Sequence, residues 1–399
     1  MTEIEFSIID ELTPTLEKIL RTFEQERGIQ IKLRQQNWKE AWRELLLWVL
    51  NGQGPDVSQV GSTWATSLLG LNAVLPLSAS TLESVGGPQD FLPPCWGSVQ
   101  DPSNQVVSSL PWTAYTFVLA YRRDLIRKAG LDERGAFRSA EELLRTARAL
   151  RKVGVARPWI SPVDPNYIDD LHFLASWIWA SGGHFVSPDG RHAGFVQPAT
   201  LKAIVHFLEL FRYTGDLPLP TGEHAAMQYF TNGMAAMTIV GYNLGYQWMR
   251  SGALAPELAA NIAFAPVPGV PWIGGNNLVI WKNARMTPQR EQAALELLTY
   301  LVDPATQELY VNSEEVILPT RGDCLKALPL SGHSITQAVL TSLETGHPYT
   351  PIHLWGKIEL KFSRALGEMA TQVVQGGDPE ALVREFAASQ APWLDMILG

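Results

Sequence analysis

Cysteine is scarce in this chain, and long apolar runs are absent from it. Cys95 and Cys324 are the two cysteines among 399 residues, which excludes a disulfide-rich scaffold and a C-x-x-C metal or redox motif. We expect two buried thiols, with a single disulfide as the alternative if they meet in space. The longest apolar runs, such as 45–50, are far shorter than the roughly 18 residues that cross a bilayer. The sequence therefore predicts no transmembrane helix.

An excess of positive charge is also missing. The chain has 31 Lys and Arg against 40 Asp and Glu, a net charge of −9. A nucleic-acid-binding protein normally shows a basic patch or stripe, so we expect no nucleic acid partner. An acidic surface favours solubility and says little more about function.

Motifs of catalysis, metal binding and nucleotide binding are not found. The chain has no G-x-S-x-G, H-E-x-x-H or EF-hand pattern. The glycines at 274–275 lack the spacing of a dinucleotide loop and the Gly-Lys-Ser/Thr ending of a P-loop. The eight histidines are scattered, and His184 and His192 flank a turn-like segment that we expect at the surface. The sequence thus predicts no cofactor, no metal and no enzyme.

The first residues do not read as a signal peptide. Residues 4–9 alternate as a strand does. We expect either that a signal peptide has been removed and the protein is extracytoplasmic, in the periplasm or lipid-anchored at the cell surface, or that it stays in the cytoplasm.

The N-terminal part alternates between strands and helices. Strands are predicted at 4–9, 29–33 and from residue 55, separated by amphipathic helices that end at Gly28 and at Gly52. This order predicts a parallel sheet covered by helices on both faces, an α/β fold.

Strands return late in the chain. Strands are predicted at 262–267 and 277–281, after a long, mainly helical stretch that contains one strand at 116–121 and another at 234–240. Two domains in series would not explain this order. It predicts two lobes that the chain enters more than once.

The segment 230–242 has the pattern of a binding tip. Asn232-Gly233 is a turn signal, 234–240 reads as a buried strand, and Gly241 precedes Tyr242-Asn243. Polar and aromatic groups at the carboxyl end of a buried strand are typical of ligand sites in open α/β sheets.

This segment, F-x-x-G-x-A-A-M-x-x-x-G, resembles one of the family 1 extracellular solute-binding proteins, the sugar-capturing subunits of ABC importers. Further segments resemble the same family in the same order, although Arg122 stands where the family has Asn. They are 23–29 (F-E…G-I), 54–77 (G-P-D-V…W…L-P-L), 110–131 (L-P…Y-R-R-D-L…A-G-L), 272–275, 293–301 and 318–321 (L-P-T-R).

The resemblance implies a two-lobe periplasmic-binding-protein-like fold of type II, similar to maltose-binding proteins, which closes on ligand by hinge bending. It implies an N-terminal lobe of 1–111 plus 262–318 and a C-terminal lobe of 112–261 plus 319–399, with a ligand cleft between them. Hinge crossovers are expected near 111–115, 261–264 and 319–321. The implied partners are a carbohydrate and the permease subunits of an ABC transporter, and the protein is expected to act as a monomer.

A sugar site needs aromatic plates for the apolar ring faces and fixed polar groups for the hydroxyls. Aromatic residues in loops or after strands are ligand candidates, with core packing as the alternative for each: Trp38, Trp64, Trp112, Tyr115, Tyr242, Trp272 and Trp355. Polar and glycine candidates at similar places are Asp10, Glu11, Asn37, Ser62, Thr63, Asn243, Gly274, Gly275, Asn276 and Glu314. Helix capping is the alternative for Asp10 and Glu11.

Two other polar residues are expected to be structural. Asp56 is interpreted as bonding its own turn, and Arg321 as holding the hinge. His172 could face the core or the cleft.

Two other functions stay open. A glycoside hydrolase would need two carboxylates about 5–10 Å apart, for which Asp10 or Glu11 could pair with Glu314. A cytoplasmic ligand-sensing module on the same fold would need no secretion signal. For a binding protein, the mixture of Trp, Asn and few charges favours a neutral mono- or oligosaccharide over a polyamine, a sugar phosphate or a metal ion.

Overall fold

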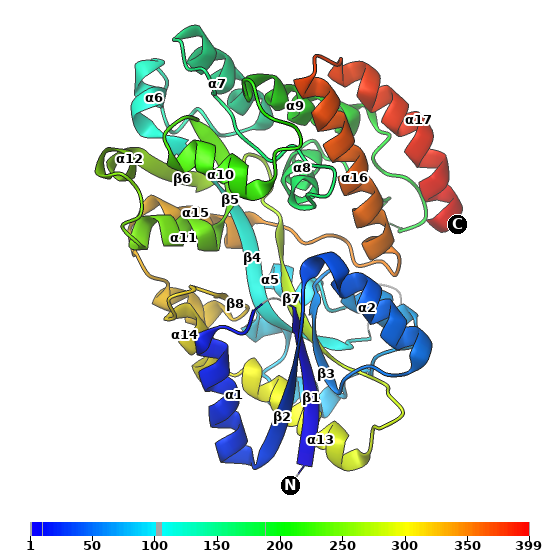
Figure 1. Ribbon diagram of the computed structural model, residues 1–399. Coiled ribbons are helices and arrows are strands. Elements are labelled where there is room, and N and C mark those ends of the chain that lie inside the picture. Colours follow the sequence, from blue (N-terminus) through cyan, green and yellow to red (C-terminus); the bar gives the residue numbers. More distant parts are fainter. Residues whose placement is uncertain (1, 10, 101–105, 188, 399) are drawn as a thin grey trace. The chain divides into compact units, whose positions relative to one another are not determined.

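The computed structural model describes residues 2–9, 11–100, 106–187 and 189–398 (Figure 1). The chain divides into two compact units, each discontinuous in sequence. Unit 1 comprises Met1–Tyr115, Ile273–Pro329 and Pro348–Gly356, and unit 2 comprises Thr116–Trp272, Leu330–His347 and Lys357–Gly399.

Unit 1 is built on a mixed sheet. Strand β1 (Thr2–Ile9) pairs in parallel with β2 (Ile29–Gln36) and β3 (Val57–Gly61). Strand β7 (Ile273–Ile280) is antiparallel to β3, with Gly61 opposite Asn276. The start of β4 (Ser109–Arg122) pairs with the short β8 (Leu318–Pro319). The ends of β1–β3 and the start of β7 therefore share one edge.

Helices cover both faces of this sheet. Because side chains alternate along a strand, Ile4, Phe6 and Ile8 of β1 join the apolar cluster of α1 (Pro14–Arg27) and α13 (Pro288–Leu301). Ile9, Val60 and Val279 join the cluster of α2 (Trp38–Asn51) and α3 (Ala65–Gly70). Figure 1 shows α1 and α2 flanking β1–β3. The smaller helices of unit 1 are α4 (Ala79–Ser84), α5 (Pro93–Gly97), α14 (Pro304–Val311) and two 3-10 turns at Pro88–Asp90 and Gly322–Ala327.

Unit 2 contains the second part of β4. There β4 pairs antiparallel with β5 (Met237–Gly241) and β6 (Ile262–Pro266). Its helices are α6 (Arg123–Lys128), α7 (Ala140–Lys152), α8 (Asp169–Ala180), α9 (Pro198–Leu210), α10 (Glu223–Thr231), α11 (Tyr242–Arg250), α12 (Pro256–Asn261), α15 (Ser334–Thr345), most of α16 (Trp355–Val374), α17 (Pro379–Leu398) and a 3-10 turn at Phe211–Tyr213.

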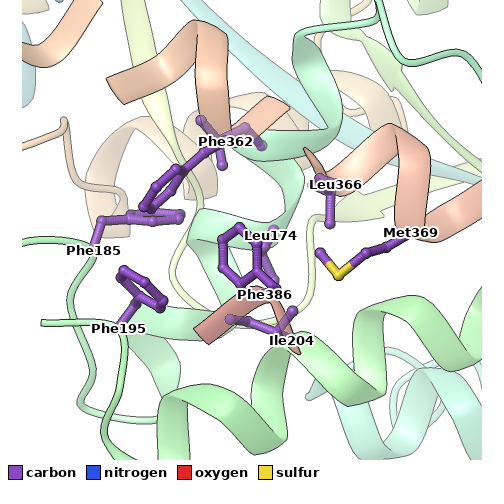
Figure 2. Close-up of a pocket in the computed structure, with 9 residues that line it drawn as sticks. Leu174, Phe185, Phe195, Ile204, Phe362, Leu366, Met369 and Phe386 are labelled. Carbon is purple, nitrogen blue, oxygen red and sulfur yellow. The ribbon is translucent and has the colours of Figure 1, made fainter. Parts of the chain in front are cut away.

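A small apolar cavity lies in the core of unit 2. Figure 2 shows phenylalanines from the 185–195 segment, α16 and α17 pointing toward one another beside residues of α8 and α9. Its lining is Leu171, Leu174, Phe185, Phe195, Ile204, Phe362, Leu366, Met369 and Phe386. A water molecule inside this cavity, of about 10 Å³, would find no polar partner, so we expect it to be dry.

The predicted strand at 234–240 is shorter than expected. Strand β5 begins at Met237, because the amide of Met234 still donates to the carbonyl of Tyr229 and that of Gly233, at φ 75°, to that of Phe230. The first predicted strand residues thus belong to the exit from α10. A second difference is α11, which starts directly at Tyr242 where a loop tip was expected.

The observed division of the chain differs from the predicted lobe boundaries. Residues 262–272 lie in unit 2, because β6 pairs with the second part of β4, where Phe264 is opposite Ala120. Residues 112–115 and 319–329 lie in unit 1, where Pro319 is opposite Thr113. Pro348–Gly356 also belongs to unit 1.

Both cysteines are buried free thiols, as expected. Burial raises the pKa of Cys95 and of Cys324 to about 12, and the Asp323 carboxylate adds to the effect on Cys324. Thiols with such pKa values are poor nucleophiles at neutral pH.

None of the helices in the described ranges combines the length and the apolar character of a bilayer-spanning segment.

Candidate functional site

Several candidate residues gather at the shared edge of the unit 1 sheet. Strand β2 ends just before Asn37 and Trp38, and β3 just before Ser62. The antiparallel β7 brings Gly274–Asn276 to the same edge, where the Ser62 amide donates to the Gly275 carbonyl over 2.9 Å. The ends of β2 and β3 and the start of β7 therefore lie at the same edge of the sheet, and the candidate residues there come from three strands.

Three indoles form a cluster at this edge, which we call the tryptophan cluster: Trp38, Trp42 and Trp64. The Trp64 ring lies 5.4 Å from Trp38 and 5.3 Å from Trp42, at interplanar angles of 60° and 45°. Trp64 is buried, Trp42 half-buried and Trp38 38% exposed. A Cβ at Gly61 would lie 3.3 Å from Trp64 and 3.5 Å from Trp38, so the glycine lets the indoles approach the backbone.

A narrow opening lies next to the cluster. It is lined by Ser62, Thr63, Ser98, Pro348, Tyr349, Thr350, Pro351 and Trp355, and we call it the hydroxyl crevice. Its volume of about 10 Å³ admits roughly one water molecule or one hydroxyl group. No charged side chain is among these lining residues. The crevice therefore suits an uncharged hydroxyl and is too small for a sugar ring.

The backbone behind the crevice is held by amide side chains and a glycine. Asn276 donates to Thr113 Oγ1 over 2.9 Å, and Asn277 donates to Ser98 Oγ over 3.2 Å. Gly275 has φ 133°, and a Cβ there would lie 1.9 Å from the Thr113 carbonyl oxygen. Only glycine satisfies both constraints, which explains the glycine at 275.

Unit 2 holds a second group of candidates. Tyr242 follows β5 and is buried, with half-buried Asn243 next to it. The Trp272 ring stacks on His172, with ring centroids 4.0 Å apart and planes within 6°. Phe117 lies 5.7 Å from the same indole. Trp272 is thus 7% exposed, with an imidazole against its ring.

His172, which the sequence left open, is buried. Burial lowers the pKa of His172 to about 3, so the imidazole is neutral at pH 7. Its Nε2 lies 3.8 Å from a carboxylate oxygen of Glu359. Because the ring is neutral, this contact is not an ion pair at neutral pH.

An acidic group at the start of α8 was missed by the sequence reasoning. Burial and the nearby Glu223 carboxylate raise the pKa of Asp169 to about 7. Burial also raises the pKa of Asp170 well above its usual value. Ser161 donates to Asp170 Oδ1 over 3.2 Å, whereas the buried Asp170 Oδ2 has no hydrogen-bond partner among the residues that the structure describes. Two adjacent acids before an apolar helix were the available signal.

Other candidates have structural contacts. Asn37 is the N-cap of α2 and accepts from the Glu40 amide over 3.1 Å. Trp112 is 4% exposed and donates to Tyr310 Oη over 3.2 Å. Burial raises the pKa of that Tyr310 hydroxyl.

The remaining candidates of unit 1 differ in exposure. Tyr115 is half-buried near the end of the first segment of unit 1, and Glu11 and Glu314 are exposed on unit 1. Asp10 lies outside the described residues.

Asp56 corrects one interpretation. It is fully buried and accepts from the Glu5 amide over 2.7 Å and from Arg290 Nε over 3.0 Å. Asp56 therefore connects β1 to α13. The prediction that it forms a hydrogen bond within its own turn was wrong.

Arg321 holds segments of unit 1 together. Its guanidinium donates to the Val85 carbonyl over 3.0 Å and lies 5.2 Å from the Phe91 ring. Asp90 approaches it to 3.4 Å.

The family model described as bacterial extracellular solute-binding protein matches residues 9–308. No curated protein matches the chain.

Similar solved structures include an ABC transporter solute-binding protein from Thermotoga lettingae bound with alpha-D-tagatose, at 21% identity and a TM-score of 0.79 over 100% of both chains. The sugar-binding protein MalE from Xanthomonas citri has 22% identity and a TM-score of 0.79, over 100% of this chain and 97% of that one. Maltose-bound MalE3 from T. maritima has 19% identity and a TM-score of 0.77 over 100% of both. These likenesses confirm the predicted fold class, the two-lobe α/β fold of periplasmic binding proteins.

Proposed function

Because this chain belongs to the bacterial extracellular solute-binding proteins, we propose that it binds a carbohydrate and delivers it to the permease of an ABC importer. The observation that carries the proposal is the uncharged hydroxyl crevice beside the tryptophan cluster. Serine, threonine and tyrosine hydroxyls both donate and accept hydrogen bonds, as sugar hydroxyls do. Indoles offer flat apolar surfaces to the C–H faces of a sugar ring.

The lining residues disfavour the other ligand classes. A polyamine would need several carboxylates, and a sugar phosphate would need arginine or lysine. The crevice provides neither. Within the described residues, no group of three or more His, Cys, Asp or Glu side chains is arranged to hold a metal ion.

Sugar ligands in the similar structures support the same class. One neighbour was solved with alpha-D-tagatose and another with maltose. We propose that the ligand-binding residues of unit 1 are Ser62, Thr63, Trp64, Gly274, Gly275, Asn276 and Trp355. For unit 2 we propose Tyr242, Asn243 and Trp272 as ligand-binding residues.

The family is one of binding proteins that act outside the cytoplasm. We propose that this protein works in the periplasm or lipid-anchored at the cell surface, as a monomer and without catalysis. Delivery requires that the permease distinguish the ligand-bound form from the free one, so the ligand must favour one conformation of the protein.

A thermal-shift panel tests the proposal. The protein is unfolded and refolded first, so that any ligand carried through purification is removed. Mono- and oligosaccharides are compared with spermidine and glucose 6-phosphate. A ligand at a hundred times its dissociation constant stabilises the native state by about 2.7 kcal/mol, which raises the melting temperature measurably. Stabilisation by one sugar class supports the proposal, and stabilisation by spermidine or the sugar phosphate alone contradicts it.

A further inference from the structure

Positive charge is concentrated in one part of unit 2, although the chain as a whole is acidic. Residues 122–157 contain eleven Lys and Arg and five Asp and Glu, a local charge of +6. The rest of the chain has 20 Lys and Arg against 35 Asp and Glu, a charge of −15. We call residues 122–157, which comprise α6, α7 and the residues around them, the basic segment. The net charge of −9 conceals this asymmetry.

Helix α7 carries part of the positive charge on its exposed side. Its apolar residues, such as Leu143 and Leu150, are buried in unit 2. Arg148, Arg151 and Lys152 are exposed. Within the described part of the chain, neither Arg148 nor Lys152 has a carboxylate within ion-pair distance. Their charges therefore face solvent.

Most carboxylates of the basic segment are already paired with bases. Four of the five form ion pairs, and these are Asp124, Glu133, Glu141 and Glu142. The partner of Glu141 is Lys202 of α9, at 3.1 Å. Because these acids are matched by bases, the excess positive charge remains on exposed side chains such as Arg148 and Lys152.

The charge of α7 also reaches the neighbouring helix α9. Burial lowers the pKa of His206 on α9, and the positive charges of Lys202 and Arg148 lower it further, whereas Glu141 and Glu209 act in the opposite direction. Figure 1 shows α7 beside α6 and α9. The bases of α7 and α9 therefore belong to one surface of unit 2.

The bases of this surface are spread out and do not gather around one point. The 13 residues of α7 span about 20 Å. Arg138 precedes the helix and Lys152 ends it. A single bound phosphate or carboxylate needs its bases to converge on it. An extended surface that carries many anions can instead contact all of these side chains.

The basic segment also lacks the apolar anchors of a protein interface. Among residues 122–157, all of which the structure describes, no large hydrophobic side chain is exposed. A protein interface has an apolar core with aromatic residues, whereas an anionic headgroup layer attracts Lys and Arg by charge alone. A nucleic acid would be attracted in the same way, but the family acts outside the cytoplasm. The charge pattern therefore favours a membrane.

We propose that the basic segment binds the surface of a membrane that contains anionic phospholipids, with Arg148 and Lys152 among the contacting side chains. The same surface repels the rest of the chain, so the attraction also orients the protein. This interaction would hold the protein near the membrane in which its permease resides. It requires no bound sugar and goes beyond the proposed function.

Flotation with lipid vesicles tests this. The vesicles are phosphatidylcholine alone and phosphatidylcholine mixed with phosphatidylglycerol in a two-to-one molar ratio. The proteins are the wild type, the double variant Arg148→Gln/Lys152→Gln, the charge-preserving Arg148→Lys and the control Arg364→Gln/Arg384→Gln. The two control arginines have side chains that are 74% and 70% exposed on α16 and α17. Circular dichroism and melting temperature establish that each variant is folded.

We expect the wild type to bind the mixed vesicles and not phosphatidylcholine alone. Binding should be lost in 1 M salt, because the Debye length falls from about 10 Å at 0.1 M to about 3 Å at 1 M. The Arg148→Gln/Lys152→Gln variant should bind the mixed vesicles roughly tenfold more weakly. Arg148→Lys and the control should stay within about twofold of the wild type.

Several results would overturn the proposal. These are equal binding to both kinds of vesicle, binding that survives 1 M salt, no binding to the mixed vesicles at 0.1 M, or equal losses in the test and control variants. Retention on polyglutamate beads without vesicle binding would assign the basic segment to an acidic protein partner and also overturn it. None of these measurements uses a sugar, so the thermal-shift panel tests the proposed function separately.

Discussion

His172 and Trp272 stack almost in parallel, with ring centroids 4.0 Å apart and planes within 6°. One ring comes from α8 and the other from the segment between β6 and β7. The hydroxyl of Thr116 donates to the Trp272 carbonyl over 3.0 Å and fixes that segment against β4. The stack thus joins three parts of unit 2 that are distant in sequence.

The stack makes stability depend on acid. The pKa of His172 is about 3 in the folded protein and about 6.5 in an unfolded chain. Below pH 6.5 the unfolded state binds the proton more readily, so folding stability falls as the pH is lowered toward 3. We expect His172→Phe, which keeps an aromatic ring and removes the titrating group, to lose less stability between pH 7 and pH 4.

The expected difference between wild type and His172→Phe at pH 4, relative to pH 7, is on the order of 1–3 kcal/mol. Chemical denaturation at both pH values measures it. His184→Phe, at an exposed histidine, is the control and should follow the wild type. Parallel pH profiles for His172→Phe and the wild type would show that the imidazole is not desolvated.

Asp169 should make folding stability fall as the pH rises, which is opposite to the effect of His172. Its pKa is about 7 in the folded protein and about 3.9 in an unfolded chain. The stability that its protonated form contributes is complete below about pH 4 and is lost as the pH rises through 7. Asp169→Asn stays neutral, so we expect its melting temperature relative to the wild type to be higher at pH 8 than at pH 4.5.

Thermal unfolding at the two pH values checks this, with an expected change of a few degrees, equivalent to roughly 1 kcal/mol or more. Glu385→Gln removes an exposed carboxylate of the same unit and should show no such change. If the melting temperature of Asp169→Asn, relative to the wild type, changes with pH no more than that of the control, the pKa of Asp169 is not raised in the folded protein.

The Asp56–Arg290 pair should matter for the stability of unit 1. Asp56 has no solvent exposure and receives hydrogen bonds from Arg290 and from the Glu5 amide. Asp56→Ala leaves a partly buried guanidinium and a backbone amide without their partner. The expected loss is about 3–5 kcal/mol in the free energy of unfolding, measured by urea denaturation.

Arg21→Gln provides the comparison for that measurement. It breaks the exposed pair with Glu17 on α1, for which we expect no more than about 0.5 kcal/mol. Losses of similar size for the two variants would mean that Asp56 is not a structural anchor.

Local signals in the sequence predicted much of the fold. Helix α1 begins after Thr13 and ends before Gly28, as expected. The Thr13 hydroxyl accepts a hydrogen bond from the Leu16 amide, Pro14 is the first helical residue, and Gly28 adopts φ 64°. These features act within a few residues and can be recognised without tertiary structure. The gathering of Trp38, Ser62 and Asn276 was also predictable, since strand ends of a sheet meet at one edge.

Contacts between distant parts of the chain could not be predicted. Asp56 finds Arg290 across 234 positions, and Trp272 meets His172 from another element. The raised pKa of Asp169 depends on Glu223, which begins another helix. In each case the partner residue is determined by tertiary packing. A local sequence pattern does not identify it. In β5 a local pattern was misleading. The residues before Met237 resemble a strand in composition, but they form the turn that ends α10.

Gly275 links the fold to the candidate site and gives the last prediction. Its backbone has φ 133°, and a Cβ would lie 1.9 Å from the Thr113 carbonyl oxygen. Gly275→Ala must therefore push β7 away from β4 and displace Asn276, which bonds Thr113. Gly376→Ala is the matched control, because Gly376 has φ 98° but no atom of the described residues lies within 4 Å of the added Cβ. We expect about 1 kcal/mol of strain in the control, a larger destabilisation of Gly275→Ala, and weakened sugar binding in Gly275→Ala only. Calorimetry and thermal unfolding measure both effects, and equal losses in the two variants would show that the close approach of β7 to β4 carries no cost.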